Sequence, residues 1–101
     1  MLLLYERERQ PFGPIMAFHK ECRERGVLVA SDPLHDPHTA TTVRIVDGTP
    51  MNIDGPFAET TEWLGGYFIL ETDRATAIEL AQRCPTARTG CVEVRQIMDT
   101  S

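Results

Sequence analysis

The chain has 101 residues, of which 25% are charged and 42% are hydrophobic, and its formal net charge is −5. This length and balance are typical of a single folded domain over residues 1–101 and not of a disordered chain. A negatively charged chain without a lysine or arginine cluster repels phosphate groups, so we expect neither nucleic acid nor a membrane as a partner. The apolar start, residues 1–5, is too short for a signal peptide or a membrane span, which predicts a cytoplasmic protein.

The three cysteines, Cys22, Cys84 and Cys91, are odd in number and show no CxxC spacing. This pattern argues against a disulfide framework and against a zinc finger, and it predicts reduced thiols. The sequence also lacks a glycine-rich phosphate-binding loop. We therefore expect no bound cofactor and no metal.

The first part of the chain predicts a helix between two strands. Residues 1–5 are apolar throughout and read as a buried strand. A helix opens at Gly13-Pro14, where proline suits the first turn, and it stops at Gly26. Its apolar stripe is formed by Ile15, Phe18, His19 and Cys22. Residues 27–30 form the second strand.

The middle of the chain predicts a loop and then a hairpin. Residues 31–38 contain two prolines and read as a loop. Residues 39–46 alternate, with Val43 and Ile45 on one face. Asp47-Gly48 is a turn signal, and residues 51–53 pair back on the preceding strand.

The last part predicts a strand, a helix and a strand. Residues 65–71 form an apolar strand, and Asp73 caps a helix that ends at Cys84-Pro85. The apolar face of this helix comprises Ala75, Ile78, Leu80 and Ala81. Residues 91–98 alternate as the last strand. The order of elements predicts an α+β fold, a ferredoxin-like split βαβ sandwich with an antiparallel sheet.

Two strands of this sheet are apolar on both faces. Residues 2–5 and 67–70 are continuous apolar runs, as is usual for strands that are buried on both sides. Two helices cover only one face of a four-stranded sheet. We therefore expect a homodimer in which a second copy packs against the other face, sheet against sheet.

The segment Asp54-Gly55-Pro56-Phe57-Ala58-Glu59-Thr60 resembles the signature of the DGPF proteins, within the YCII-related superfamily. The resemblance continues through residues 40–44 and 47–48 before it, and through residues 64–68, 81–85 and 90–95 after it. It implies a dimeric ferredoxin-like fold, the dimeric α+β barrel. Three positions depart from the family's pattern: Thr61 replaces a usual lysine, Trp63 a common polar residue and Gln96 a common proline. If that lysine contributes to a site elsewhere in the family, the site in this chain is altered.

The resemblance implies less about activity than about fold. The wider YCII-related group is similar in fold to muconolactone isomerases and includes a dehydrochlorinase that acts on a chlorinated aromatic compound. Related proteins have been proposed to act through a His–Asp pair. DGPF members also occur beside, or fused to, alternative sigma factors, which implies a regulatory setting.

Asp54 and His19 are the candidate catalytic residues. A partly buried carboxylate serves as a general base or orients a histidine, and histidine is suited to proton transfer at neutral pH. Each residue also has a structural interpretation. Asp54 precedes Gly-Pro and would cap a turn, and His19 would lie at the boundary of the helix with one nitrogen bonded.

Four charged residues are candidates for substrate binding: Arg44, Arg95, Glu59 and Glu62. An arginine on a strand binds a carboxylate ligand bidentately, or it pairs with Glu93 or Glu71 across strands. If their segment is helical, Glu59 and Glu62 share a face and form a carboxylate pair. Otherwise they are solvated or pair with Arg44 or Arg95.

Residues 35–38, His-Asp-Pro-His, contain potential zinc ligands, but they lack helical spacing and a partner elsewhere, so we expect no metal there. The sequence favours an enzyme or enzyme-like binder of a small organic acid, lactone or aromatic compound. Its cleft would lie between the sheet and residues 31–38, with Arg44 anchoring the carboxylate of the ligand. The alternatives are a non-catalytic dimeric module that senses a ligand or contacts an alternative sigma factor, and a purely architectural role for the DGPF segment.

Overall fold

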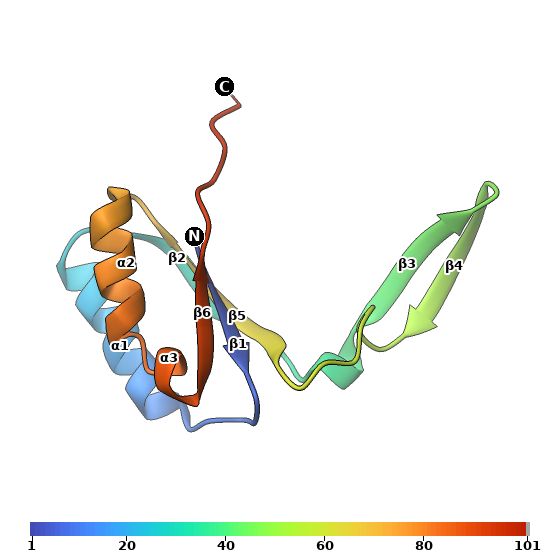
Figure 1. Ribbon diagram of the computed structural model, residues 1–101, viewed down its shortest axis with the longest axis horizontal. Coiled ribbons are helices and arrows are strands. Elements are labelled where there is room, and N and C mark those ends of the chain that lie inside the picture. Colours follow the sequence, from blue (N-terminus) through green and yellow to red (C-terminus); the bar gives the residue numbers. More distant parts are fainter. Residues whose placement is uncertain (101) are drawn as a thin grey trace.

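The fold is built on a four-stranded antiparallel sheet with the strand order β2-β5-β1-β6 (Figure 1). In the computed structural model, which describes residues 1–100, the strands are β1 (Leu2–Glu6), β2 (Leu28–Pro33), β5 (Trp63–Leu70) and β6 (Gly90–Val94). Helix α1 (Phe12–Glu24) joins β1 to β2, and helices α2 (Arg74–Arg83) and α3 (Thr86–Thr89) join β5 to β6. This is the split βαβ arrangement, so the predicted ferredoxin-like α+β fold is confirmed.

The hydrophobic core lies between the sheet and the two longer helices, which cover the same face (Figure 1). Phe18 of α1 packs edge-on against Phe68 of β5, with ring centroids 5.0 Å apart. This arrangement suits two aromatic quadrupoles. The other buried members of the core are Leu2, Leu4, Cys22, Leu80, Ala81 and Cys84.

The helix termini follow from local sequence. Asp73 caps α2, because its Oδ1 accepts the backbone N–H of Thr76 at 2.7 Å. After α1, Gly26 takes a positive φ of 74°, which glycine adopts without strain. The predicted face of α2 was partly wrong, because Ala75 and Ile78 are exposed. No helix in the described part of the chain is long and apolar enough to span a membrane.

Several element boundaries differ from those predicted. Strand β2 runs to Pro33, because Ser31, Asp32 and Pro33 pair with β5. The last strand ends at Val94 and not at Met98, because its partner β1 begins at Leu2, which pairs with Val94. No pattern in the sequence predicted α3. Because β2 extends to Pro33, the loop is shorter than the predicted residues 31–38, and a single 3₁₀ turn, η1 (Pro37–Thr39), follows it.

The predicted hairpin forms an arm that stands apart from the sheet. Strands β3 (Thr41–Val46) and β4 (Thr49–Asp54) pair only with each other, and we call this two-stranded unit the arm. Asp47 and Gly48 both have positive φ, 49° and 79°, as a tight two-residue hairpin turn requires. The arm projects on the side of the sheet opposite to the helices (Figure 1), so the radius of gyration, 15.5 Å, exceeds the about 13 Å of a compact domain of this size.

Candidate functional site

A cavity of about 480 Å³ opens between the first half of α1, the sheet and the segment 85–89. We call it the α1 cavity. Its apolar walls include Leu4, Ile15 and Phe68. Its polar lining includes Glu6, Arg9, His19, Ser31 and Arg88. The volume and the mixture of apolar walls with a few polar groups are typical of sites for small molecules.

His19 lies in this cavity and is held by β2. Its Nδ1 is hydrogen-bonded to the Ser31 hydroxyl at 2.6 Å, and its ring lies 6.3 Å from the ring of Phe68. These contacts fix the orientation of the imidazole. Among residues 1–100 no hydrogen bond to Nε2 is found, so this nitrogen remains for a ligand.

Glu6 is the second polar group inside the cavity. Strand alternation places it on the same face as Leu2 and Leu4, towards the helices. Its carboxyl group lies against Gly65 of the neighbouring strand, and its side chain is only 16% exposed. Within the described residues Oε2 is buried without a hydrogen-bond partner, and the Arg9 Nη1 atom lies 3.9 Å away. The wall of the cavity therefore contains a carboxylate oxygen that lacks a donor and is shielded from solvent.

Asp54 does not share this cavity with His19. It lies at the end of β4 and lines a second depression, at the base of the arm, together with His38, Glu59 and Trp63. The adjacent turn is held by other groups: the Gly55 N–H donates to Ala40 O at 2.7 Å. The Thr42 hydroxyl donates to Gly55 O at 2.8 Å. No hydrogen bond of the Asp54 side chain is found within residues 1–100.

The comparison with protein families agrees with this architecture. A family model described as the YCII-related domain matches residues 5–101, nearly the whole chain. The chain belongs to the YCII-related family. No curated protein matches it. Membership of the narrower DGPF group stays a prediction.

The predicted substrate-binding residues of this YCII-related chain do not lie together in one site. Segment 55–62 is not helical, so Glu59 and Glu62 do not share a helix face. Glu62 pairs with Arg7 at 3.8 Å and not with Arg44 or Arg95. Arg44 lies on the arm opposite Met51, and the Arg95 backbone N–H donates to Met1 O at 2.8 Å. Their roles in binding stay predictions.

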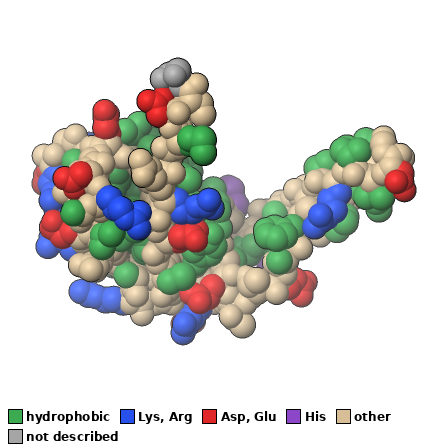
Figure 2. All heavy atoms as spheres, turned by 45° about the horizontal axis from the view of Figure 1, so that its top comes forward, with side chains coloured by type: hydrophobic (Ala, Val, Ile, Leu, Met, Phe, Trp, Pro, Cys, Tyr) green, Lys and Arg blue, Asp and Glu red, His purple; other side chains and the backbone are tan. Residues whose placement is uncertain are grey.

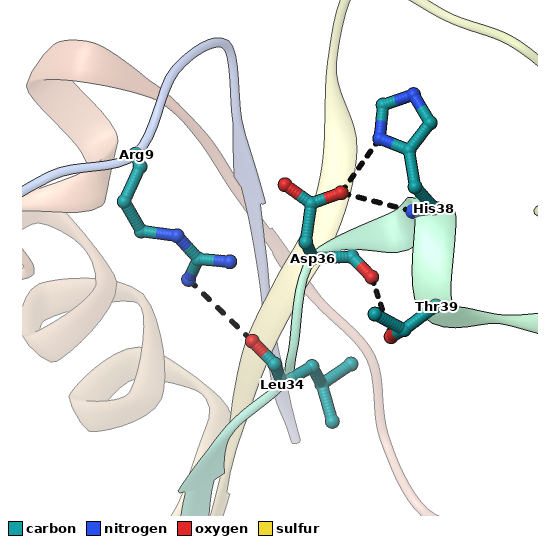
Figure 3. A network of polar contacts seen from close by, with 5 residues as sticks. All are labelled: Arg9, Leu34, Asp36, His38 and Thr39. Carbon is teal, nitrogen blue, oxygen red and sulfur yellow. Dashed lines mark hydrogen bonds and ion pairs between the residues drawn. The ribbon is translucent and has the colours of Figure 1, made fainter.

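The segment that contains the potential zinc ligands forms a local polar network (Figure 3). The Asp36 Oδ1 atom accepts the His38 backbone N–H at 2.9 Å and contacts its ring Nδ1 at 2.7 Å. The backbone hydrogen bond, followed by the ring, lowers the pKa of the Asp36 carboxyl. The Thr39 hydroxyl donates to Asp36 O, and Arg9 Nη1 donates to Leu34 O, one residue before the segment. No cluster of three or more metal-binding side chains occurs in the described residues.

Several polar residues of the α1 cavity in this YCII-related protein were not predicted as site residues from the sequence, among them Glu6, Arg9, Ser31 and Arg88. The alternation of side chains along β1 indicates Glu6, because Glu6 follows Leu2 and Leu4 on the core face of this strand. No comparable pattern marked Ser31, because its strand was expected to end before it. Only the pairing of Ser31 with Phe68 brings its hydroxyl to His19.

Proposed function

We propose that this YCII-related protein is an enzyme-like binder of a small organic acid, lactone or aromatic compound. The ligand occupies the α1 cavity, and His19 carries a proton to or from it. The observation that supports the proposal is the hydrogen bond between His19 and Ser31 inside a largely apolar cavity of about 480 Å³. A histidine held through one nitrogen, with the other directed to a ligand, is the usual arrangement for proton transfer.

The α1 cavity contains two arginines that suit an acid, besides the carboxylates of Glu6 and Asp32. Arg9 and Arg88 both line it, and a guanidinium binds a carboxylate bidentately. The proposal therefore gives the anchoring role to these two residues. Asp54 and Glu59 line the depression at the base of the arm and remain candidates there, and Arg44 lies further along the arm, opposite Met51.

The proposal is tested by titrating the ¹⁵N-labelled protein with benzoate and with a butenolide lactone. We expect backbone resonance shifts around the α1 cavity, and exchange of the acidic ring proton of the lactone with D₂O. His19→Phe should abolish exchange, whereas the exposed His35→Phe should retain it. Shifts confined to the base of the arm, or exchange that survives His19→Phe, would contradict the proposal.

We also propose that the protein acts as a homodimer. The arm exposes apolar side chains on both of its sides (Figure 2), and an isolated two-stranded hairpin is marginally stable in water. Val43 and Ile45 are 61% and 64% exposed on one side, and Met51 and Ile53 are 46% and 49% exposed on the other. A second copy would cover these residues together with the open face of the sheet, which the helices leave uncovered.

The oligomeric state tests this second proposal. We expect the wild-type chain to sediment as a dimer and the double variant Val43→Asp/Ile45→Asp to sediment as a monomer. Thr49→Asp, which adds one charge to an exposed polar position of the arm, is the control. A wild-type chain that sediments as a monomer would contradict the proposed homodimer.

A regulatory function would use the same exposed arm. In this alternative the chain is a non-catalytic, ligand-sensing module in the cytoplasm that contacts an alternative sigma factor. It requires that a sigma factor co-purifies with the wild-type chain and not with Val43→Asp/Ile45→Asp. Recovery of the sigma factor with neither chain would eliminate it.

A further inference from the structure

We propose that Glu6 selects the ligand of the α1 cavity by accepting a hydrogen bond from a neutral hydroxyl group. The inference rests on the proposed function, because it concerns the same cavity. It narrows the ligand to a hydroxy acid: the hydroxyl group meets Glu6, and the acid group meets Arg9 or Arg88.

Glu6 Oε2 is buried, and the described residues provide it with no hydrogen-bond partner. Burying a carboxylate oxygen without a donor is unfavourable, and a ligand hydroxyl that supplies the donor recovers that free energy. An ether oxygen at the same place has no hydrogen to donate, so Glu6 discriminates against it.

The neighbouring strands β1 and β5 accommodate the carboxylate between them. The carboxyl group of Glu6 occupies the space that a side chain at position 65 would fill. Gly65 itself is buried, so this space lies inside the cavity wall and not at the surface. The acceptor therefore lies in the wall of the cavity, and a ligand hydroxyl reaches it when the flexible end of Glu6 turns towards the open space.

The Arg9 guanidinium lies 3.9 Å from Glu6 Oε2, beyond hydrogen-bond length but close enough to offset part of its charge. A cationic ligand is therefore not required. A hydroxyl group forms a short, charge-assisted bond with a carboxylate and brings no charge of its own to Glu6.

The test compares 4-hydroxybenzoate with 4-methoxybenzoate, which share the ring and the acid group and differ in the donor. Affinities are measured by NMR titration of the full-length chain. We expect 4-hydroxybenzoate to bind at least about tenfold more tightly, as one hydrogen bond to a charged group allows. Glu6→Met should abolish this preference while retaining the binding of 4-methoxybenzoate. Glu8→Met, which removes an exposed carboxylate nearby, should leave the preference unchanged.

The outcomes separate this inference from the proposed function. If both acids bind in the cavity with equal affinity to the wild-type chain, the role of Glu6 is wrong and the small-molecule site stands. If neither acid shifts resonances of the cavity, both proposals fail. A preference that survives in Glu6→Met would overturn the inference. If this variant does not fold, Glu6→Gln replaces it and should reduce the preference, because the amide is uncharged.

Discussion

The carboxyl group of Glu6 lies directly against the backbone of Gly65, so closely that a β-carbon at position 65 would overlap it. The two residues belong to neighbouring antiparallel strands, β1 and β5, whose register shifts after Leu4. The glycine leaves a space on β5, and the glutamate fills that space from β1. Neither residue alone explains the buried acceptor in the cavity.

Gly65→Ala should displace the Glu6 carboxyl without unfolding the protein. The atoms that an added β-carbon would meet belong to the flexible end of Glu6, which can rotate away. We expect the melting temperature to change little and the affinity for 4-hydroxybenzoate to fall to that for 4-methoxybenzoate. Calorimetry and NMR titration measure the two effects. Unchanged affinity would show that the position of the carboxyl does not matter for binding.

Glu6→Met should stabilise the ligand-free protein. The substitution replaces a buried carboxylate that lacks a donor with an apolar side chain of similar length. We expect the free energy of unfolding to rise by about 1 kcal/mol in urea titrations. Glu8→Met, at an exposed position, should leave it unchanged. A large loss of stability in Glu6→Met would mean that the carboxylate is satisfied in the folded protein.

Gly90→Ala should destabilise the protein. A β-carbon at position 90 would collide with the backbone carbonyl of Tyr5, which cannot move without disturbing the pairing of β1 and β6. We expect a loss of about 1–3 kcal/mol, as in other overpacked sites, measured by chemical denaturation. Gly13→Ala is the matched control, because nothing lies within 4 Å of its added carbon. Equal stability of the two variants would refute the close approach.

The N-cap of α2 should give a pH-dependent stability. The Thr76 backbone N–H donates to the Asp73 carboxylate and lowers its pKa from the ordinary 3.8. Because the folded pKa lies below the unfolded one, the stabilisation is complete above the unfolded value and is lost as pH falls through the folded value. We expect Asp73→Ala to melt a few degrees below the wild type at neutral pH.

Thermal unfolding of both chains at several pH values measures this effect. The difference between the two melting temperatures should shrink as the pH falls below 3.8. Glu71→Ala, at an exposed position before the cap, should show no such trend. A difference in melting temperature that persists in strong acid would mean that Asp73 does not stabilise the helix through its charge.

The three thiols should differ in reactivity. Burial in the core raises the pKa of Cys22 to about 11 and also raises the pKa of Cys84. Partial desolvation and the neighbouring Glu62 raise the pKa of Cys91 too, but only Cys91 is exposed to a reagent. Since the thiolate is the nucleophile, we expect a disulfide reagent to modify Cys91 first and the other two only after unfolding. Titration with and without denaturant measures this order. In Cys91→Ser no thiol should react in the folded protein, and rapid reaction of a second thiol would contradict the core packing.

Patterns that depend on neighbours along the chain predicted the fold correctly. The stripe that includes Phe18 and Cys22, the Asp47-Gly48 turn and the Asp73 cap all appear where expected. Helix periodicity, turn geometry and capping depend on residues within a few positions of each other. Predictions that needed a distant partner were less accurate. The end of the last strand was wrong because it depends on where β1 begins.

The sequence by itself predicted the order β1, α1, β2, β5, α2 and β6, because periodicity and turn residues are local properties, and the resemblance of residues 54–60 indicated the family. The tertiary structure alone decided which polar side chains share a cavity. His19 meets Ser31 across a helix and a strand, and Glu6 meets Gly65 across two strands. It also separated Asp54 from His19, although both had been predicted for one site. Such contacts depend on register and packing between segments far apart in the chain, which local patterns do not encode.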